Sequence, residues 1–234
     1  MPKLKIDKKK PIVISLGGSM IVPECGPDTE FLNRMDKLVR SFVEKGQLVA
    51  IICGGGKTAR HYIDAAAQIH KIDPEDLDWI GIHATRLNAH LVRTLFRDIA
   101  HPVVIKDPTK TPKRWKGKVL VASGWKPGWS TDYVASRMAH KLGVKNVVNV
   151  SNISHVFEED PRKNPEAKPL NELSWKVYRL MVGDNWHPGK SAPFDPIASK
   201  FCQKNKMEVA VASADLENLK KVMSGENWVG TLLK

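Results

Sequence analysis

The chain of 234 residues has few cysteines and no long apolar run. Its three cysteines (Cys25, Cys53 and Cys202) are an odd number without Cys-x-x-Cys spacing, which excludes a disulfide framework and argues against a closed zinc site. The longest apolar stretches, such as Leu48 to Cys53, are too short to cross a bilayer, and no signal-peptide pattern follows the lysine-rich start. The eight histidines lack paired-ligand spacing, so no transition-metal site is expected. We therefore predict a cytoplasmic protein with no membrane partner.

Positive charge is in excess and unevenly placed. The chain has 37 Lys and Arg against 25 Asp and Glu, and nine of the twelve excess charges fall in residues 1–10 and 106–118. A basic tail and a basic loop around Trp115 fit a nucleic-acid footprint. A frayed terminus and a solvated loop explain them more simply, and we favour that interpretation. Either way, the charge favours anionic substrates or partners.

The repeating pattern is a short β-branched run, a glycine turn and a helical segment. Apolar runs predict strands at 11–16, 47–53, 102–105, 118–122, 146–150, 207–213 and 228–233. Helical spacing predicts helices at 28–45, from 56 to about 70, and at 73–99, 131–142, 171–182, 195–205 and 215–223. Near-continuous apolar strands separated by helices indicate an α/β fold, with a mainly parallel sheet covered on both faces.

Polar turns follow several of the predicted strands. Gly17-Gly18-Ser19 ends the first strand and Gly54-Gly55-Gly56-Lys57 ends the second, while Ser151-Asn152 and residues 124–132 follow two others. Ligands of parallel sheets bind at such carboxyl ends, where backbone N–H groups form anion-binding nests. The second turn opens a helix that carries Lys57 and Arg60, which together indicate phosphate binding. Neither turn has Walker A or Rossmann spacing, so a P-loop NTPase and a dinucleotide dehydrogenase are disfavoured.

Six motifs in a fixed order carry a family resemblance. They are ISLGGS from Ile14, CGGGKTAR from Cys53, GIHATRLNA from Gly81, PGWSTDYVA from Pro127, NISHVFEEDP from Asn152 and FDPIA from Phe194. Together they resemble the amino acid kinase superfamily, and within it the archaeal-type uridylate (UMP) kinases. The resemblance implies a three-layer α/β/α sandwich of the amino acid kinase type that transfers the γ-phosphoryl group of ATP to UMP. It also implies Mg²⁺ bound with ATP, and a homohexamer.

The same resemblance implies a domain plan and a set of site residues. The plan has a basic tail at 1–10 and one kinase domain at 11–234, divided into an acceptor lobe at about 11–142 and an ATP lobe at about 143–234. Phosphoryl transfer needs donors and cations rather than a nucleophilic triad. The implied catalytic residues are Asp132, Lys190, Gly18 and Ser19. The implied ATP-binding residues are Gly17, Gly18, Gly56, Arg60, Ser151, Asn152, Phe157 and Asp160, and the implied UMP-binding residues are Gly55, Asp78, Pro127, Gly128, Trp129, Ser130, Thr131, Asp132 and Tyr133.

Two positions depart from the superfamily pattern. Ser15 stands where many members carry a lysine. Archaeal-type uridylate kinases also lack this lysine, and its absence leaves more charge neutralisation to Mg²⁺ and another cation. Ser154-His155 replaces the usual Asp-Gly and changes the loop expected beside ATP. Two alternatives therefore stay open: a kinase of the same fold acting on another phosphate or small acid, and a nucleotide- or oxyanion-binding protein without turnover. Nucleic-acid binding through the basic segments has the least support.

Overall fold

A seven-stranded sheet forms the centre of the computed structural model, which describes residues 1–24, 26–112, 114–184 and 192–234. The strand order is β3-β2-β1-β4-β8-β9-β7, and every neighbouring pair is parallel except β8 with β9. Two short strands, β5 (Val156–Phe157) and β6 (Pro169–Leu170), pair separately as an antiparallel hairpin. The strands of the sheet are β1 (Ile12–Leu16), β2 (Val49–Cys53), β3 (Val119–Ala122), β4 (Asn146–Ser151), β7 (Glu172–Leu173), β8 (Glu208–Ser213) and β9 (Thr231–Leu233).

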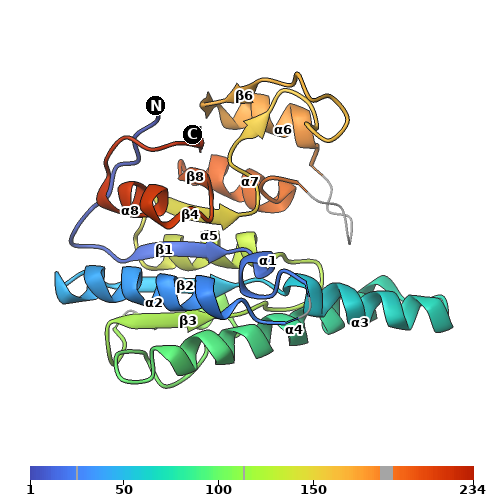
Figure 1. The fold of residues 1–234 in the computed structure, drawn as a ribbon, viewed down its shortest axis with the longest axis horizontal. Helices are drawn as coiled ribbons and strands as arrows, with labels where there is room; N and C mark the ends of the chain where they lie inside the picture. Colours follow the sequence, from blue (N-terminus) through green and yellow to red (C-terminus); the bar gives the residue numbers. More distant parts are fainter. Residues whose placement is uncertain (25, 113, 185–191) are drawn as a thin grey trace.

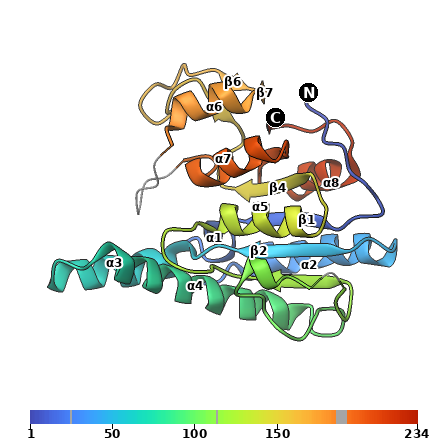
Figure 2. The same ribbon diagram turned by 180° about the vertical axis from the view of Figure 1, so that it is seen from behind.

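Helices cover both faces of the sheet, as Figures 1 and 2 show from opposite sides. Side chains alternate along β1, so Ile12, Ile14 and Leu16 join one core cluster and Val13 joins the other. The first cluster contains residues of α2 (Thr29–Glu44), α4 (Pro74–Leu95) and α8 (Leu216–Ser224). The second contains residues of α5 (Thr131–Lys141), α6 (Trp175–Val182) and α7 (Pro196–Lys204). The predicted three-layer α/β sandwich with a mainly parallel sheet is thus confirmed.

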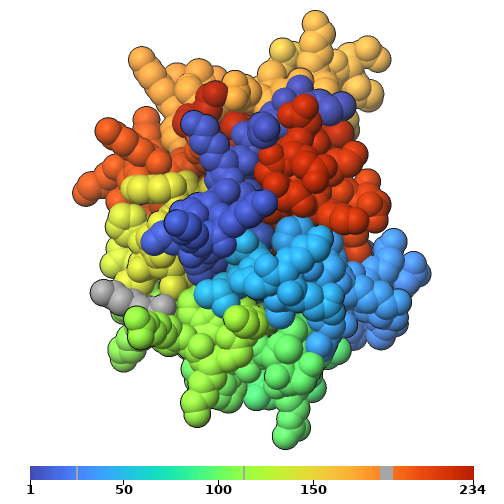
Figure 3. Space-filling model, turned by 90° about the vertical axis from the view of Figure 1, so that its left-hand side faces the viewer, coloured from blue at the N-terminus to red at the C-terminus, as the bar shows by residue number. Residues whose placement is uncertain are grey.

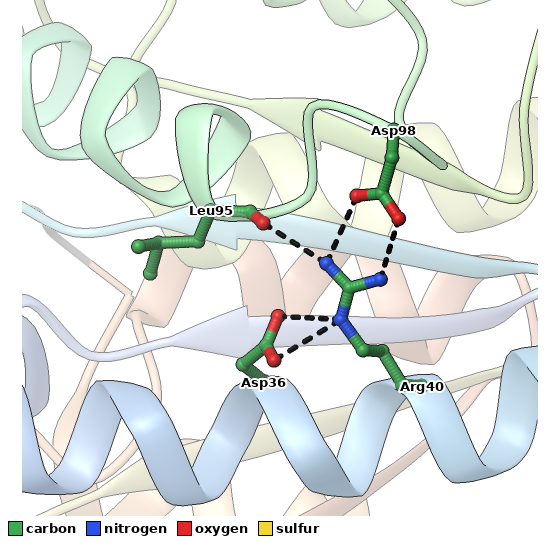
Figure 4. A network of polar contacts seen from close by, with 4 residues as sticks. All are labelled: Asp36, Arg40, Leu95 and Asp98. Carbon is green, nitrogen blue, oxygen red and sulfur yellow. Dashed lines mark hydrogen bonds and ion pairs between the residues drawn. The ribbon is translucent and has the colours of Figure 1, made fainter.

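Arg40 ties α2 to the end of α4 (Figure 4). Its guanidinium makes a two-pronged pair with Asp98, at 2.7 and 2.9 Å, and donates to the carbonyl oxygen of Leu95 at 3.1 Å. Nε also contacts Asp36 one turn earlier on α2, at 3.0 Å. These hydrogen bonds raise the pKa of Arg40 and lower that of Asp98. Fork-shaped pairing of this kind fixes orientation as well as adding charge attraction.

Three predicted elements were wrong in detail. Residues 102–105 are not a strand, since Ile105 makes an isolated bridge to Ala122 beside β3. The helix expected at 171–182 begins only at Trp175, because Glu172 and Leu173 form β7 and Ser174 caps the helix by accepting from the Val177 N–H. The last strand is Thr231–Leu233 rather than 228–233. Two short helices were not expected: α1 (Gly18–Ile21) and the 3₁₀ turn η1 (Pro108–Lys110).

The basic N-terminal segment is not frayed. Pro2 and Leu4 are buried between exposed lysines, and Leu4 is 0% exposed within the first core cluster. Lys3 forms an antiparallel bridge with Asn227, and Asn146 donates to the carbonyl oxygen of Lys5. Alternating apolar residues therefore hold this segment against the body while its lysines face solvent.

Candidate functional site

Two glycine turns interlock at the carboxyl edge of the sheet. Gly17 N–H donates to the carbonyl of Val150 at 2.8 Å, and Gly54 N–H donates to the carbonyl of Leu16 at 2.9 Å. A Cβ on Gly18 would lie 1.9 Å from the backbone nitrogen of Gly56. Gly56 in turn has a φ of +64°, and a Cβ there would lie 2.4 Å from the Gly18 oxygen. Only glycine fits at these two positions, so the turns form one rigid backbone surface.

Side chains of α4 hold the second turn and the neighbouring loop in place. Asn88 donates to the carbonyls of Gly54 and Gly55, at 2.8 and 3.1 Å. The buried Thr85 hydroxyl accepts from Gly124 N–H at 2.8 Å and donates to a carbonyl of its own helix. The buried face of α4 thereby fixes both the glycine turn after β2 and the loop after β3. The helix α3 (Gly56–Ile69) starts in the same turn.

Asp132 is a half-buried residue at the start of α5, and its carboxylate lies beside Ser15 of β1. Its Oδ1 accepts from the Ser15 hydroxyl at 2.9 Å, and its Oδ2 accepts from the backbone N–H of Asp195 at 3.2 Å. It therefore joins β1, the start of α5 and the start of α7. Ser15 stands where the superfamily often has lysine, and here its hydroxyl takes up one carboxylate oxygen.

A second carboxyl group, that of the buried Asp195, lies beside Asp132. Asp195 caps α7 by accepting from Ala198 N–H at 2.6 Å, while its Oδ2 is buried without a hydrogen bond among the described residues. Burial raises the pKa of Asp132 to about 7, assisted by the charge of Asp195 and opposed by the Ser15 hydrogen bond. Burial also raises the pKa of Asp195, although the nearby Ser130 hydroxyl works against it. The pair holds its protons far more tightly than exposed aspartates do.

Several of the residues expected to bind UMP lie in or next to the loop between β3 and α5. Asp78 on α4 accepts from Gly128 N–H at 2.7 Å, fifty positions away in sequence. Ser130 caps α5 by accepting from Tyr133 N–H at 3.1 Å, with Thr131 opening the helix. Trp129 stacks between Tyr133 and Trp125, with ring centroids 4.1 and 5.8 Å away. The remaining members of this set are Gly55, in the turn after β2, Pro127, in the loop between β3 and α5, and Asp132, in the first turn of α5.

The residues expected to bind ATP are less closely gathered. Ser151 ends β4 next to Gly17, and Asn152 follows it in the exposed loop. Phe157 lies on β5 with its ring against His155, at a centroid distance of 6.2 Å. Asp160, further along the same segment, is held by Arg162 at 2.8 Å, which lowers its pKa to about 2. Its carboxylate thus already has a cationic partner.

Three cations were considered for phosphate contact. Arg60 is exposed on α3, one turn beyond Gly56. Lys57 pairs with Glu24 at 3.1 Å, close to the turn but with its charge engaged. The prediction for Lys190 falls outside the described residues.

Sequence reasoning missed several residues that build the site. Asp195 was noted within a motif but given no role, although Asp-Pro before a helical pattern is an N-cap signal. Tyr178 hydrogen-bonds both the carbonyl and the N–H of Phe194, at 2.8 and 2.7 Å, and so fixes the residue before Asp195. Asn88 and Thr85 looked like ordinary helix positions. No spacing rule marks such side chains, because their partners are backbone groups of distant turns.

Comparison with known proteins identifies this architecture. Residues 10–213 match the amino acid kinase family, and the chain belongs to that family. A uridylate kinase of Thermococcus kodakarensis is 34% identical over 223 residues, covering 92% of this chain and 96% of that protein. The crystal structure of uridylate kinase from Archaeoglobus fulgidus superimposes with a TM-score of 0.79 at 28% identity, covering 95% and 100% of the two chains. A UMP kinase structure from Bacillus anthracis, at 20% identity and a TM-score of 0.77, shares the fold. These findings confirm the resemblance drawn from the six motifs.

Two further observations concern the described residues. None of their helices combines the length and apolar character that crossing a membrane requires. Within the same ranges, no three His, Cys, Asp or Glu side chains gather closely enough to hold a metal ion.

Proposed function

We propose that the protein is a uridylate kinase, which transfers the γ-phosphoryl group of ATP to UMP and forms UDP. The observation that carries this proposal is the interlocked pair of glycine turns, with Asp132 bonded to Ser15 just before the first of them, in a chain matched nearly end to end by uridylate kinases. Such turns present backbone N–H groups to phosphate oxygens without side chains in the way. In-line phosphoryl transfer needs no nucleophilic side chain from the protein.

Each part of the site has a proposed task. Gly17, Gly18 and Ser19 receive the transferring phosphate, with Gly56 and Arg60 on the other phosphates of ATP. Asp132 is a positioning residue: through Ser15 and the Asp195 backbone it fixes β1 and α7 against α5. Lys190 supplies the cation that offsets charge on the transferring group. Ser151, Asn152, Phe157 and Asp160 border the adenosine side.

The residues around the start of α5 and Asp78 are proposed to bind UMP. We assign Asp78 to the ribose hydroxyls, because a carboxylate accepts two hydrogen bonds and Asp78 is already oriented by Gly128. Ser130 and Thr131 donate to the acceptor phosphate at the start of α5, where the helix dipole favours an anion. Gly55, Pro127 and Tyr133 complete the wall, and Trp129 offers a ring face to the base.

Mg²⁺ belongs to this proposal as a companion of ATP. The described residues lack a cage of three ligating side chains, which fits an ion held mainly by phosphate oxygens and water. Among the described residues, Oδ2 of Asp195 is the one oxygen of the Asp132 and Asp195 carboxyl groups without a hydrogen-bond partner, so we propose that it supports the ion. When bound, the ion would neutralise charge on the phosphates.

The enzyme is further proposed to act in the cytoplasm as a homohexamer. Supporting an assembly, α3 has no buried residue in the single chain, and Tyr62 and Ile69 on it are 68% and 72% exposed. Light scattering after size exclusion measures the state directly.

A coupled assay with ATP and Mg²⁺ tests the function. Offered UMP, CMP, AMP and small acids, the enzyme is expected to turn over UMP best. A different preferred acceptor would reassign the substrate. Measurable ATP binding with no turnover of any acceptor would instead indicate a binding protein of the same fold, consistent with its Ser154-His155 loop.

A further inference from the structure

Most of the excess positive charge gathers at the edge of the sheet opposite the candidate site. Among the residues that the structure describes, the segments that lead into β1, β2, β3, β4 and β8 (1–11, 44–48, 114–118, 141–145 and 204–208) contain thirteen Lys and Arg residues against three carboxylates, a balance of +10. We call these thirteen residues the basic edge: Lys3, Lys5, Lys8, Lys9, Lys10, Lys45, Arg114, Lys116, Lys118, Lys141, Lys145, Lys204 and Lys206. They are scattered in sequence and meet because neighbouring parallel strands begin at one edge.

Backbone contacts link these segments side by side. The carbonyl of Lys10 accepts from the Gln47 side chain at 2.6 Å, and that of Lys118 accepts from Val49 N–H at 3.0 Å. Lys145 donates through Nζ to the carbonyl of Asn205 at 3.0 Å. Figure 3 faces this edge: the blue N-terminal segment crosses the centre, between the light-blue end of α2, the yellow start of β4 and the green segment before β3. The basic edge is therefore one continuous surface.

The charges of the basic edge are not neutralised. All thirteen side chains belong to exposed residues, and none takes part in an ion pair within the part of the chain that the structure describes. The carboxylates of the same segments are Asp7, Glu44 and Glu208. The adjoining segments 96–101 and 224–230 add only one net negative charge. The mutual repulsion of the thirteen basic side chains is therefore relieved only by solvent, ions or a bound polyanion.

The composition of this surface favours nucleic acid over a membrane or a protein. Twelve of the thirteen residues are lysine, which is depleted in protein–protein interfaces but contacts phosphates as a point charge. Apart from Met1, the four most exposed apolar side chains lie on helices: Leu180 on α6, Ile69 and Tyr62 on α3, and Leu87 on α4. Val103 and Val229, which lie in loops, are the next most exposed and stand singly. A surface helix that inserts into lipid needs apolar residues beside its charges. The five β-strands from β3 to β8 span about 19 Å, at ~4.8 Å between neighbouring strands. Along one nucleic-acid strand, about six phosphates cover that length.

We propose that the basic edge binds nucleic acid through the phosphate backbone, without reading bases. This activity is separate from the kinase site, because β1 runs its full length between the two edges, about 16 Å for five residues. That distance exceeds the Debye length of about 8 Å at physiological salt. Nucleic acid and nucleotide substrates should therefore bind independently.

Fluorescence anisotropy with a labelled single-stranded RNA of mixed sequence tests the proposal on the full protein. Affinity is expected to fall on the order of 100-fold between about 50 and 200 mM salt, since each phosphate contact releases counterions. Saturating UMP and ATP should leave the affinity unchanged. Replacing five lysines of the basic edge by glutamine is expected to weaken binding at least about tenfold and to keep UDP formation: Lys8, Lys10, Lys116, Lys145 and Lys206.

A matched variant carries five glutamines at exposed lysines away from this edge: Lys37, Lys71, Lys106, Lys163 and Lys168. It has the same net charge as the first variant, and its RNA affinity should stay near that of the parent. Equal weakening in both variants, or displacement of RNA by ATP, would overturn the proposal. So would absence of RNA binding at low salt, or preferential binding to vesicles containing phosphatidylserine.

Discussion

Replacing Asp132 by asparagine should make the protein more stable and less active at neutral pH. The pKa of Asp132 is raised from 3.8 to about 7, chiefly by burial and then by Asp195. Between about pH 4 and 7 the folded protein therefore keeps a proton that the unfolded chain has released. The free energy of unfolding falls as pH rises through this window, and the loss above pH 7 is about 4 kcal/mol at 1.36 kcal/mol per pKa unit.

Asparagine removes this penalty because it cannot ionise. Its Oδ1 can accept from Asp195 N–H, and its Nδ2 can donate to the Ser15 hydroxyl, so both positions keep a partner. Asp132→Asn should match the parent near pH 4 and exceed its free energy of unfolding by up to about 4 kcal/mol at pH 8. Formation of UDP should drop by about 100-fold, the scale expected when a preorganised polar group is lost.

Urea denaturation of both proteins at intervals from about pH 4 to 8 measures the difference directly. Asp195→Asn is the matched control: it keeps the cap on Ala198 but removes the neighbouring charge, so it should recover part of the same stability. The double variant should gain less than the sum, because both changes relieve one repulsion. A stability difference that stays constant with pH would refute the reasoning. Tyr178 and Cys202, whose pKa values the two carboxylates help to raise, should not titrate in this range.

Three further changes follow from the packing. Gly18→Ala should abolish UDP formation and lower the free energy of unfolding, because the added Cβ would collide with Gly56. At Gly81 on α4 an added Cβ meets nothing within 4 Å, so Gly81→Ala should raise the free energy of unfolding by about 0.5–1 kcal/mol in a urea titration. Thr85→Val should lower the free energy of unfolding by about 1–3 kcal/mol, because the buried Gly124 N–H loses its hydrogen-bond acceptor. Thr94→Val, on the exposed side of the same helix, should lower it little, and equal losses in the two variants would contradict this account. Arg40→Lys should lower the midpoint of thermal denaturation through loss of the fork to Asp98. Arg34→Lys, whose pair with Glu30 is exposed, should have no measurable effect on the same midpoint.

The alternation of apolar strands and helices was enough to predict the fold class. Runs such as Ile12–Leu16 and Val49–Cys53 are buried on both faces, and this is the pattern that parallel strands leave in a sequence. The failures were short or edge elements. The two residues of β7 gain their place from pairing with β9, some sixty positions later, and no local propensity encodes that. Residues 102–105 have strand composition but run along β3 with isolated bridges.

The site was predictable where backbone geometry demands a residue type. Gly18 and Gly56 were visible as turns, and Ser130 and Asp132 as the start of a helix. The pairing of the two aspartates could not be predicted, because Asp195 lies 63 positions after Asp132 and no local pattern indicates that they are in contact. The grouping of the surface lysines was not predictable from the sequence either. Lysines that looked like a loose tail and loop become one face once the strand order is known.

The interlock between Gly18 and the turn from Gly54 to Gly56 also bears on the entropy of ligand binding. Two loops that touch backbone to backbone have no room to fluctuate separately, so a phosphate would meet donors that are already ordered. The amides of Gly17 and Gly54, each bonded to a neighbouring strand, should accordingly exchange with deuterium as slowly in the free enzyme as in the nucleotide complex. Any closure during turnover would then be confined to parts of the chain outside this pair of turns.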